Sequence, residues 1–179
     1  MPKKLGHIVV AELKKRSKKA LDFAKKILSE EQIDDPILRR ALNHYLKHWN
    51  DFTHPGLFSI ACEAVGGNPD NVIPAQAAIT MIAAAFDIHD DIIDKSKTKH
   101  KIPTVYGKFG AERALLLGDA FLIEGIKLFI ESAKTLPEEK QKKALETLKQ
   151  LIFEVGNAHS KEISLKERKS KAPKEYMQV

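Results

Sequence analysis

The sequence has few of the residues that mark secreted, disordered or repetitive chains. It contains one cysteine, Cys62, which cannot form an intramolecular disulfide and is typical of core packing in a reducing compartment. Glycine and proline number 9 and 8 among 179 residues, and we find neither a low-complexity stretch nor an internal repeat. The N-terminus lacks the apolar core of a signal peptide, and the longest uncharged run, 71–86, is shorter than a membrane span. We therefore expect a cytoplasmic protein.

Arginine is also scarce. Five of the 30 basic residues are Arg and the rest are Lys, and the formal net charge is +6. No zinc knuckle, RNA-binding aromatic pattern or helix-turn-helix signal accompanies this charge, so we expect no nucleic-acid partner. The positive field would favour an anionic substrate. The basic, amphipathic segment 5–28 could contact a membrane surface, although a surface helix on a protein core is the simpler interpretation.

Helical periodicity, in contrast, is present along the whole chain. No run alternates with period two for long enough to predict a strand. The hydrophobic content of 43% is sufficient for one domain with a sizeable core. We therefore expect a single all-α domain over 1–179, a helical bundle with short loops. The segments with helical period are 5–28, 36–49, 55–66, 71–94, 104–133 and 135–165. The last of these begins with a capping-box pattern at Thr135. We expect a polar, basic loop over 95–103 and a basic linker over 166–174.

A cluster of carboxylates lies at the end of the apolar segment 71–94. Asp90 and Asp94 are one helical turn apart, as are Asp87 and Asp91, so each pair shares a face. The repulsion within each pair, and the negative end of the helix dipole, would be relieved by a bound cation. Oxygen ligands favour Mg²⁺. An acidic helix end on the surface is the alternative, but the buried character of the helix and the basic loop after it favour a metal site.

Several short motifs accompany this cluster. Asp90 to Asp94 has the form DDxxD, and His89 precedes it. The other motifs are ACEAVGG at 61–67, PTV at 103–105, KFG at 108–110 and GDA at 118–120. Together they resemble the trans-isoprenyl diphosphate synthases, relatives of the class I terpene synthases, over about residues 35–179. The resemblance implies an isoprenoid synthase-type helical bundle, here apparently without its C-terminal helices.

The resemblance also implies a chemistry and its site. In that family the DDxxD motif binds Mg²⁺, which binds the diphosphate of an allylic prenyl substrate and stabilises it as it leaves. Asp90, Asp91 and Asp94 are then the metal ligands and the catalytic residues.

Substrate contacts are implied by the same comparison. Lys99 and His100 stand where the family usually has Arg-Arg, so they are the expected diphosphate contacts. Phe86 lies four residues before the motif, near where family members set chain length with bulky residues. Small residues before it could leave room for a prenyl chain, among them Ala78, Ala83, Ala84 and Ala85. Ordinary helix packing is the alternative for these apolar positions.

Three departures from the family affect the reaction. The family binds isopentenyl diphosphate through a Gly-Gly-Lys-Arg-x-Arg-Pro segment. Aligned on Pro55, this chain has Asp51 and Phe52 in place of the Lys and the Arg, and Ala83 replaces a family His. We therefore expect a degenerate isopentenyl diphosphate site. The third departure is that the family's second Asp-rich motif is absent.

Three functions remain open on these grounds. The first is a Mg²⁺-dependent, polyprenyl synthetase-like prenyltransferase, and the second is a class I terpene synthase that acts on the allylic diphosphate alone. The third is a non-catalytic subunit that binds prenyl diphosphate. A half-length bundle should leave helix surface uncovered, so we also expect a homodimer or a complex with a partner subunit.

Overall fold

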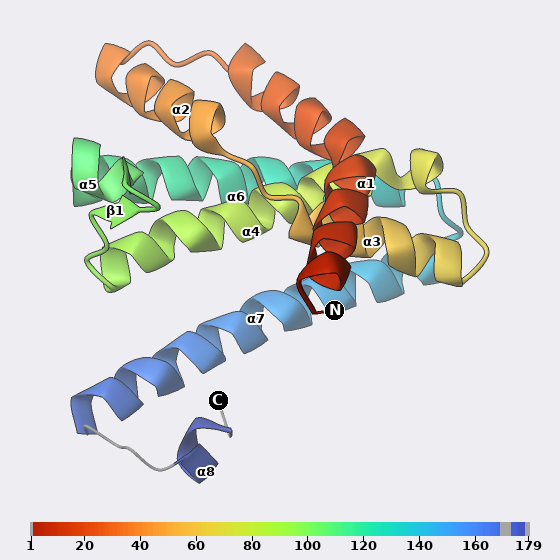
Figure 1. The fold of residues 1–179 in the computed structure, drawn as a ribbon. Helices are drawn as coiled ribbons and strands as arrows, with labels where there is room; N and C mark the ends of the chain where they lie inside the picture. The colour runs from red at the N-terminus through yellow and green to blue at the C-terminus, as the bar shows by residue number, and fades with distance from the viewer. Residues whose placement is uncertain (1, 169–172, 178–179) are drawn as a thin grey trace. The chain divides into compact units, whose positions relative to one another are not determined.

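The computed structural model describes residues 2–168 and 173–177, which are almost entirely helical (Figure 1). The all-α prediction is therefore confirmed. The chain divides into two compact units, Met1–Ser132 and Ala133–Val179, and each is described by itself. In chain order the elements are α1 (Pro2–Glu30), α2 (Pro36–His48), α3 (Thr53–Ala64), the 3₁₀ turn η1 (Pro69–Val72), α4 (Ile73–Ile93), β1 (Thr98–Lys99), β2 (Ile102–Pro103), α5 (Val105–Phe109), α6 (Ala111–Ala133), α7 (Glu138–Arg168) and α8 (Pro173–Tyr176).

The start of α2 follows the signal that its sequence carries. Asp35 has extended backbone, and its Oδ1 accepts hydrogen bonds from the N–H groups of Ile37 and Leu38. These groups have no partner inside the helix, so the carboxylate satisfies them and also faces the positive end of the helix dipole. Pro36 occupies the first turn, where its missing N–H costs nothing. The helix predicted from Pro36 is confirmed.

Two other predictions were wrong in their local detail. Residues 104–133 form two helices, because Gly110 adopts φ 91° and ends α5 before α6 begins. The polar loop predicted over 95–103 contains a small antiparallel hairpin, in which Thr98 pairs with Pro103 and Lys99 with Ile102. Its strands are two residues long, too short to show an alternating pattern in the sequence.

The turn of this hairpin is strained. His100 and Lys101 have φ of 50° and 68°, a left-handed conformation that two-residue hairpins require and that Asn and Gly adopt most easily. Lys101→Gly should therefore raise the free energy of unfolding by about 0.5–1 kcal/mol, net of the greater flexibility of the unfolded chain. Urea denaturation measures this change. Lys101→Ala removes the same side chain but keeps the strain, so a glycine variant no more stable than the alanine variant would contradict the account.

The core of the first unit is centred on α4, which packs against α1 and α3. By length and composition alone the segment Pro69–Ile93 could cross a membrane, and half of its apolar window is buried inside the protein. Tyr45, Trp49 and Phe121 form an aromatic cluster within this core, with ring centroids 5.2–5.7 Å apart. The other buried apolar residues of the hydrophobic core are Ala24, Leu28, Ala41, Leu42, Ala77, Ala78, Met81, Ala84, Ala85, Ile88, Val105, Ala114, Leu117 and Leu128.

Glycines on α6 allow that helix to lie directly beside α4 (Figure 1). A Cβ on Gly125 would lie 2.8 Å from Ile82 Cγ1 and 2.9 Å from the carbonyl oxygen of Ala78, closer than real contacts. A Cβ on Gly118 would overlap the ring of His89. Larger residues at these two positions would separate the helices, so the close approach depends on glycine.

The second unit consists of α7 and α8. α7 begins at Glu138, three residues after the Thr135 start that its capping-box pattern predicts, and it extends to Arg168. Glu138 and Glu139 lie in its first turn, where negative charge is favourable. The basic linker predicted over 166–174 falls partly on residues 169–172, outside the described residues, and partly on the ends of α7 and α8.

Candidate functional site

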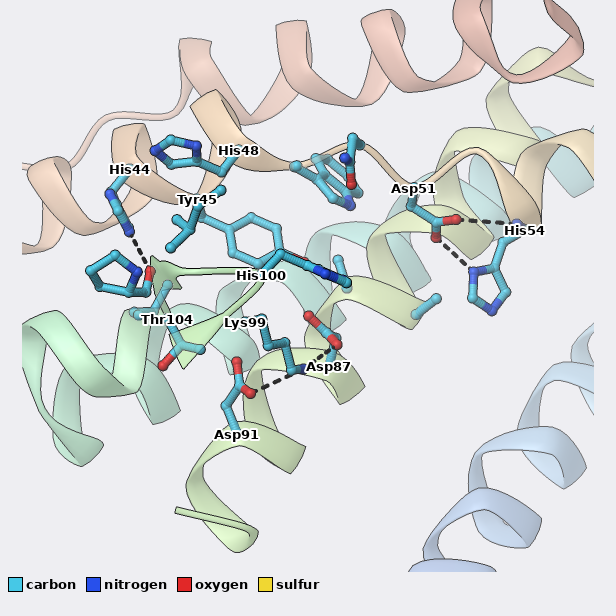
Figure 2. A pocket seen from close by; sticks show the side chains of 17 residues that line it. His44, Tyr45, His48, Asp51, His54, Asp87, Asp91, Lys99, His100 and Thr104 are labelled. Carbon is cyan, nitrogen blue, oxygen red and sulfur yellow. Dashed lines mark hydrogen bonds and ion pairs between the residues drawn. The ribbon is translucent and has the colours of Figure 1, made fainter. Parts of the chain in front are cut away.

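A cavity of about 430 Å³ lies in the first unit between α2, the last turns of α4 and the β1–β2 hairpin (Figure 2). This volume falls within the range of small-molecule sites. Ala83 and Ala84 of α4 contribute small apolar surface to it, while carboxylates, histidines and one lysine face it from the surrounding elements. The cavity can therefore hold a ligand with both an apolar and a charged part.

An ion-paired triad lies at the α4 side of the cavity. Lys99 Nζ, from β1, lies 2.7 Å from Asp87 Oδ1 and 3.0 Å from Asp91 Oδ1 (Figure 2). Asp87 and Asp91 are one turn apart on α4, so one ammonium group reaches both. Burial by itself would lower the pKa of Lys99, but its hydrogen bond to Asp87 and its ion pair with Asp91 raise that pKa. Lys99 is therefore a stable cation in this arrangement.

Asp91 is the most buried of the acidic residues in this cluster. It is 5% exposed, and burial raises its pKa although Lys99 acts in the opposite direction. Its Oδ1 lies within ion-pair distance of Lys99 but makes no well-directed hydrogen bond. A buried carboxylate oxygen whose acceptor capacity is not filled is suited to a cation.

The four carboxylates share one side of α4. At 3.6 residues per turn, Asp87, Asp90, Asp91 and Asp94 fall within an arc of about 100°. Asp87 and Asp91 line the cavity, and Asp90 and Asp94 do not. Over the described ranges, the structure gathers no group of three or more His, Cys, Asp or Glu side chains that could enclose a metal ion by themselves. A metal here would take one or two carboxylates and complete its shell with ligand oxygens, as Mg²⁺ commonly does.

The β1–β2 hairpin is held over the cavity by contacts at the base of the hairpin. His44 Nε2 lies 2.7 Å from the carbonyl oxygen of Pro103, so Nε2 carries the hydrogen, and Nδ1 can accept from Lys108 Nζ at 3.3 Å. Thr104 Oγ1 donates to the Ser96 carbonyl oxygen at 2.7 Å. These bonds fix both ends of the hairpin and thereby fix where Lys99 enters the site.

A carboxylate–histidine pair, Asp51 and His54, lies at the α3 side of the cavity. Asp51 Oδ1 accepts hydrogen bonds from the backbone N–H groups of Thr53 and His54, and these bonds start α3 two residues before the predicted Pro55. Asp51 Oδ2 lies 2.6 Å from His54 Nδ1 (Figure 2). This hydrogen bond raises the pKa of His54. Burial alone would raise the pKa of Asp51, but its bonds to His54 and to the backbone lower it. Asp51 therefore faces the site with a partner for its charge.

These pKa shifts predict a pH window for stability. The pKa of His54 is raised above its ordinary value of 6.5. Its contribution to the free energy of unfolding is therefore full below pH 6.5 and is lost as pH rises through the raised pKa. The pKa of Asp51 is lowered below its ordinary value of 3.8. Its contribution to the free energy of unfolding is therefore full above pH 3.8 and is lost as pH falls through the lowered pKa. The His54 side chain is 54% exposed, so we expect only about 0.5 kcal/mol. Urea denaturation at pH 5.5 and 8.5 should show wild type losing its advantage over His54→Gln at the higher pH, and a constant difference would contradict this.

The structure distributes the predicted site residues unevenly. Asp91, Lys99 and His100 line the cavity, whereas Phe86 is half-buried and lies outside the lining, as far as the chain is described. Ala83 and Ala84 line it as well. Ala78 and Ala85 do not line it. Both are fully buried in the core, in agreement with the helix-packing alternative.

Three features of the site were not predicted. Asp87 reaches Lys99, His44 holds the hairpin, and Asp51 engages His54. The four-residue spacing of Asp87 and Asp91 was a signal for the first of these, and the spacing of Asp51 and His54 across a helix start was a signal for the third. The contact between His44 and Pro103 joins distant parts of the chain, and no local pattern indicates it.

Comparison with known proteins agrees with this fold. The model of the polyprenyl synthetase family matches residues 35–179. A geranylgeranyl pyrophosphate synthase from Geoglobus acetivorans is 28% identical over 167 residues, which cover 93% of this chain and 51% of that protein. A geranylgeranyl diphosphate synthase from Sulfolobus acidocaldarius is 25% identical over 82% of this chain and 44% of its own length.

Solved structures give the same result. The geranylgeranyl pyrophosphate synthetase of Geoglobus acetivorans superposes with a TM-score of 0.80 at 29% identity, covering 92% of this chain and 52% of that one. The enzyme from Pyrococcus horikoshii gives 0.79 at 25% identity, covering 93% and 50%. The fold is therefore that of the isoprenyl diphosphate synthases. The chain belongs to the polyprenyl synthetase family, and it spans about half the length of the curated relatives that it matches.

Proposed function

We propose that this protein is an isoprenoid biosynthesis enzyme that binds an allylic prenyl diphosphate through Mg²⁺ at the acidic end of α4. The observation that carries the proposal is Asp91, a buried carboxylate that lines the cavity with an oxygen lacking a directed hydrogen bond, in a chain of the polyprenyl synthetase family. The relatives named above are geranylgeranyl diphosphate synthases, which supports a prenyltransferase reaction.

The donor set fits the proposed metal. Asp90, Asp91 and Asp94 supply carboxylate oxygens from one side of α4, and hard oxygen ligands suit Mg²⁺. When bound, Mg²⁺ would neutralise negative charge on the leaving diphosphate. The protein's own contribution is to position these carboxylates at the end of a largely buried helix and to hold Lys99 and His100, on the hairpin, in the cavity that Asp91 lines. The small residues Ala83 and Ala84 leave apolar space beside the charged groups for the prenyl chain.

A class I terpene synthase reaction is the second candidate. It needs one allylic diphosphate and no isopentenyl diphosphate. Asp51 and Phe52 stand where the family has cationic residues for the second diphosphate. At this end of the cavity, the side chain that can carry a positive charge beside Asp51 is His54. A single half-exposed histidine gives weak diphosphate binding near neutral pH. This observation favours a reaction on the allylic substrate alone.

A non-catalytic subunit that binds prenyl diphosphate is the third candidate. On α6 the apolar residues Leu116, Ile123 and Ile130 are exposed at intervals of seven. Such a stripe is suited to a second helix, so we propose association with a second copy or a partner subunit. Light scattering after size exclusion tests this, and a stable monomer at micromolar concentration would contradict it.

Product analysis by mass spectrometry separates the three candidates. The protein is incubated with Mg²⁺ and C10, C15 or C20 allylic diphosphates, each with and without isopentenyl diphosphate. Longer diphosphates formed only with isopentenyl diphosphate would support the prenyltransferase, and hydrocarbons or alcohols formed without it would support the terpene synthase. Mg²⁺-dependent binding without turnover would support the non-catalytic subunit. Absence of both binding and turnover would contradict the proposed function.

A further inference from the structure

We propose that Asp87, Asp91 and Lys99 form a cation-exchange site, in which the Lys99 ammonium is a built-in counter-ion that a divalent cation must displace. The displaced ammonium then becomes available to a diphosphate in the same cavity. This inference deepens the proposed function and rests on it for the identity of the anion. The exchange itself concerns the protein and the cation alone.

The geometry places the ammonium where a metal would bind. Lys99 Nζ lies 2.7 Å from Asp87 Oδ1 and 3.0 Å from Asp91 Oδ1, so it lies between carboxylates from successive turns of α4 (Figure 2). A divalent cation bound to Asp91, which is also one of the proposed Mg²⁺ ligands, would compete with the ammonium group for the same carboxylate oxygen. Occupancy by Lys99 and occupancy by the metal are therefore mutually exclusive.

One ammonium does not fully satisfy this pair. It carries a single positive charge against the two carboxylates that it contacts. Asp91 is 95% removed from solvent, and its Oδ1 still lacks a directed hydrogen bond. A divalent ion brings twice the charge and coordinates oxygen without the directional demands of an N–H donor. The local electrostatics thus favour replacement of the ammonium by such an ion.

Lys99 can leave without disrupting the core. Its side chain is 40% exposed, and it lies on a two-residue strand beside the strained turn at His100 and Lys101. The base of the hairpin is fixed independently by the bond between His44 and Pro103. The flexible lysine stem can therefore move its charge across the cavity while the backbone stays in place.

The exchange predicts coupling between cation and anion. While Lys99 is paired with the aspartates, its charge is compensated and attracts a diphosphate weakly. Metal binding removes that compensation and frees the ammonium beside His100, which lines the same cavity. By linkage, a bound diphosphate that holds Lys99 must strengthen metal binding by the same factor by which the metal strengthens diphosphate binding.

Lys99→Met tests the exchange directly, because methionine keeps an unbranched side chain and removes the competing charge. The first readout is Mn²⁺ alone, titrated by electron paramagnetic resonance as a paramagnetic substitute for Mg²⁺. We expect Lys99→Met to bind Mn²⁺ about tenfold more tightly than wild type. Lys97→Met is the matched control, since it loses the same charge from the same loop, and it should change affinity by less than about twofold. Thermal unfolding followed by circular dichroism verifies that both variants are folded.

The second readout is the coupling. Inorganic pyrophosphate should strengthen Mn²⁺ binding to wild type and to Lys97→Met, and it should strengthen binding to Lys99→Met several-fold less. The proposal is overturned if Lys99→Met binds Mn²⁺ no more tightly than Lys97→Met, or binds none. If Lys99→Met tightens Mn²⁺ binding but no allylic diphosphate binds to wild type, the exchange stands and the proposed function fails. If substrate binding depends on Mg²⁺ but Lys99→Met matches its control, only the exchange fails.

Discussion

Phe121→Ala should lower the free energy of unfolding by about 3–5 kcal/mol. Phe121 is completely buried on α6, and its ring contacts Tyr45 and Trp49 with centroids 5.2 and 5.7 Å away. Truncation removes the buried apolar area and both aromatic contacts, and it leaves a cavity where α2 meets α6. Urea denaturation followed by circular dichroism measures the loss.

Phe121→Leu is the matched control for this substitution. Leucine retains most of the apolar volume, so it should cost about 1–2 kcal/mol, mainly for the aromatic contacts and imperfect packing. A large difference between the two variants would show that the site is packed as described. An alanine variant within about 1 kcal/mol of wild type would contradict the central position of Phe121 in the core.

Asp91→Asn should weaken Mg²⁺-dependent binding of an allylic diphosphate by at least about 100-fold. Asparagine has nearly the shape of aspartate, so the buried side chain still fits on α4, but it no longer supplies negative charge to a cation. Isothermal titration calorimetry with and without Mg²⁺ separates the metal-dependent part of the affinity from the rest.

Asp70→Asn is the control for charge. Asp70 is exposed in η1 and pairs with Lys19 of α1 at 2.7 Å, and it lies outside the cavity lining. Its substitution should leave Mg²⁺-dependent binding within about twofold of wild type, because an exposed pair contributes little and solvent screens its charge. Equal losses in both variants would mean that Asp91 acts only through net charge.

Local patterns were sufficient to predict most of the helices. The cap at Asp35, the proline at position 36 and the long apolar segment that became α4 each act through contacts a few residues apart, so the sequence displays them. The break at Gly110 is also local, but glycine is common within helical patterns, and only the observed φ of 91° distinguishes a helix end. The hairpin at 98–103 is too short for periodicity to indicate it.

The sequence indicated the chemical type of the candidate site but not its arrangement. The spacing of Asp90, Asp91 and Asp94 indicated a cation site at the end of α4, and their assignment as metal ligands stays a prediction. The partner of Asp91 depends on the hairpin, which brings Lys99 to α4 through the bond between His44 and Pro103. That bond joins residues 59 apart in the sequence, and contacts at such a separation leave no periodic signal.

The most direct test of the central claim is calorimetric titration of the wild-type protein with C10, C15 and C20 allylic diphosphates, with Mg²⁺ present or chelated. We expect at least one of them to bind with Mg²⁺, and we expect chelation to reduce its affinity by at least about 100-fold. Binding of equal strength without the metal, or no binding of any of the three, would contradict a Mg²⁺-dependent prenyl diphosphate site on α4.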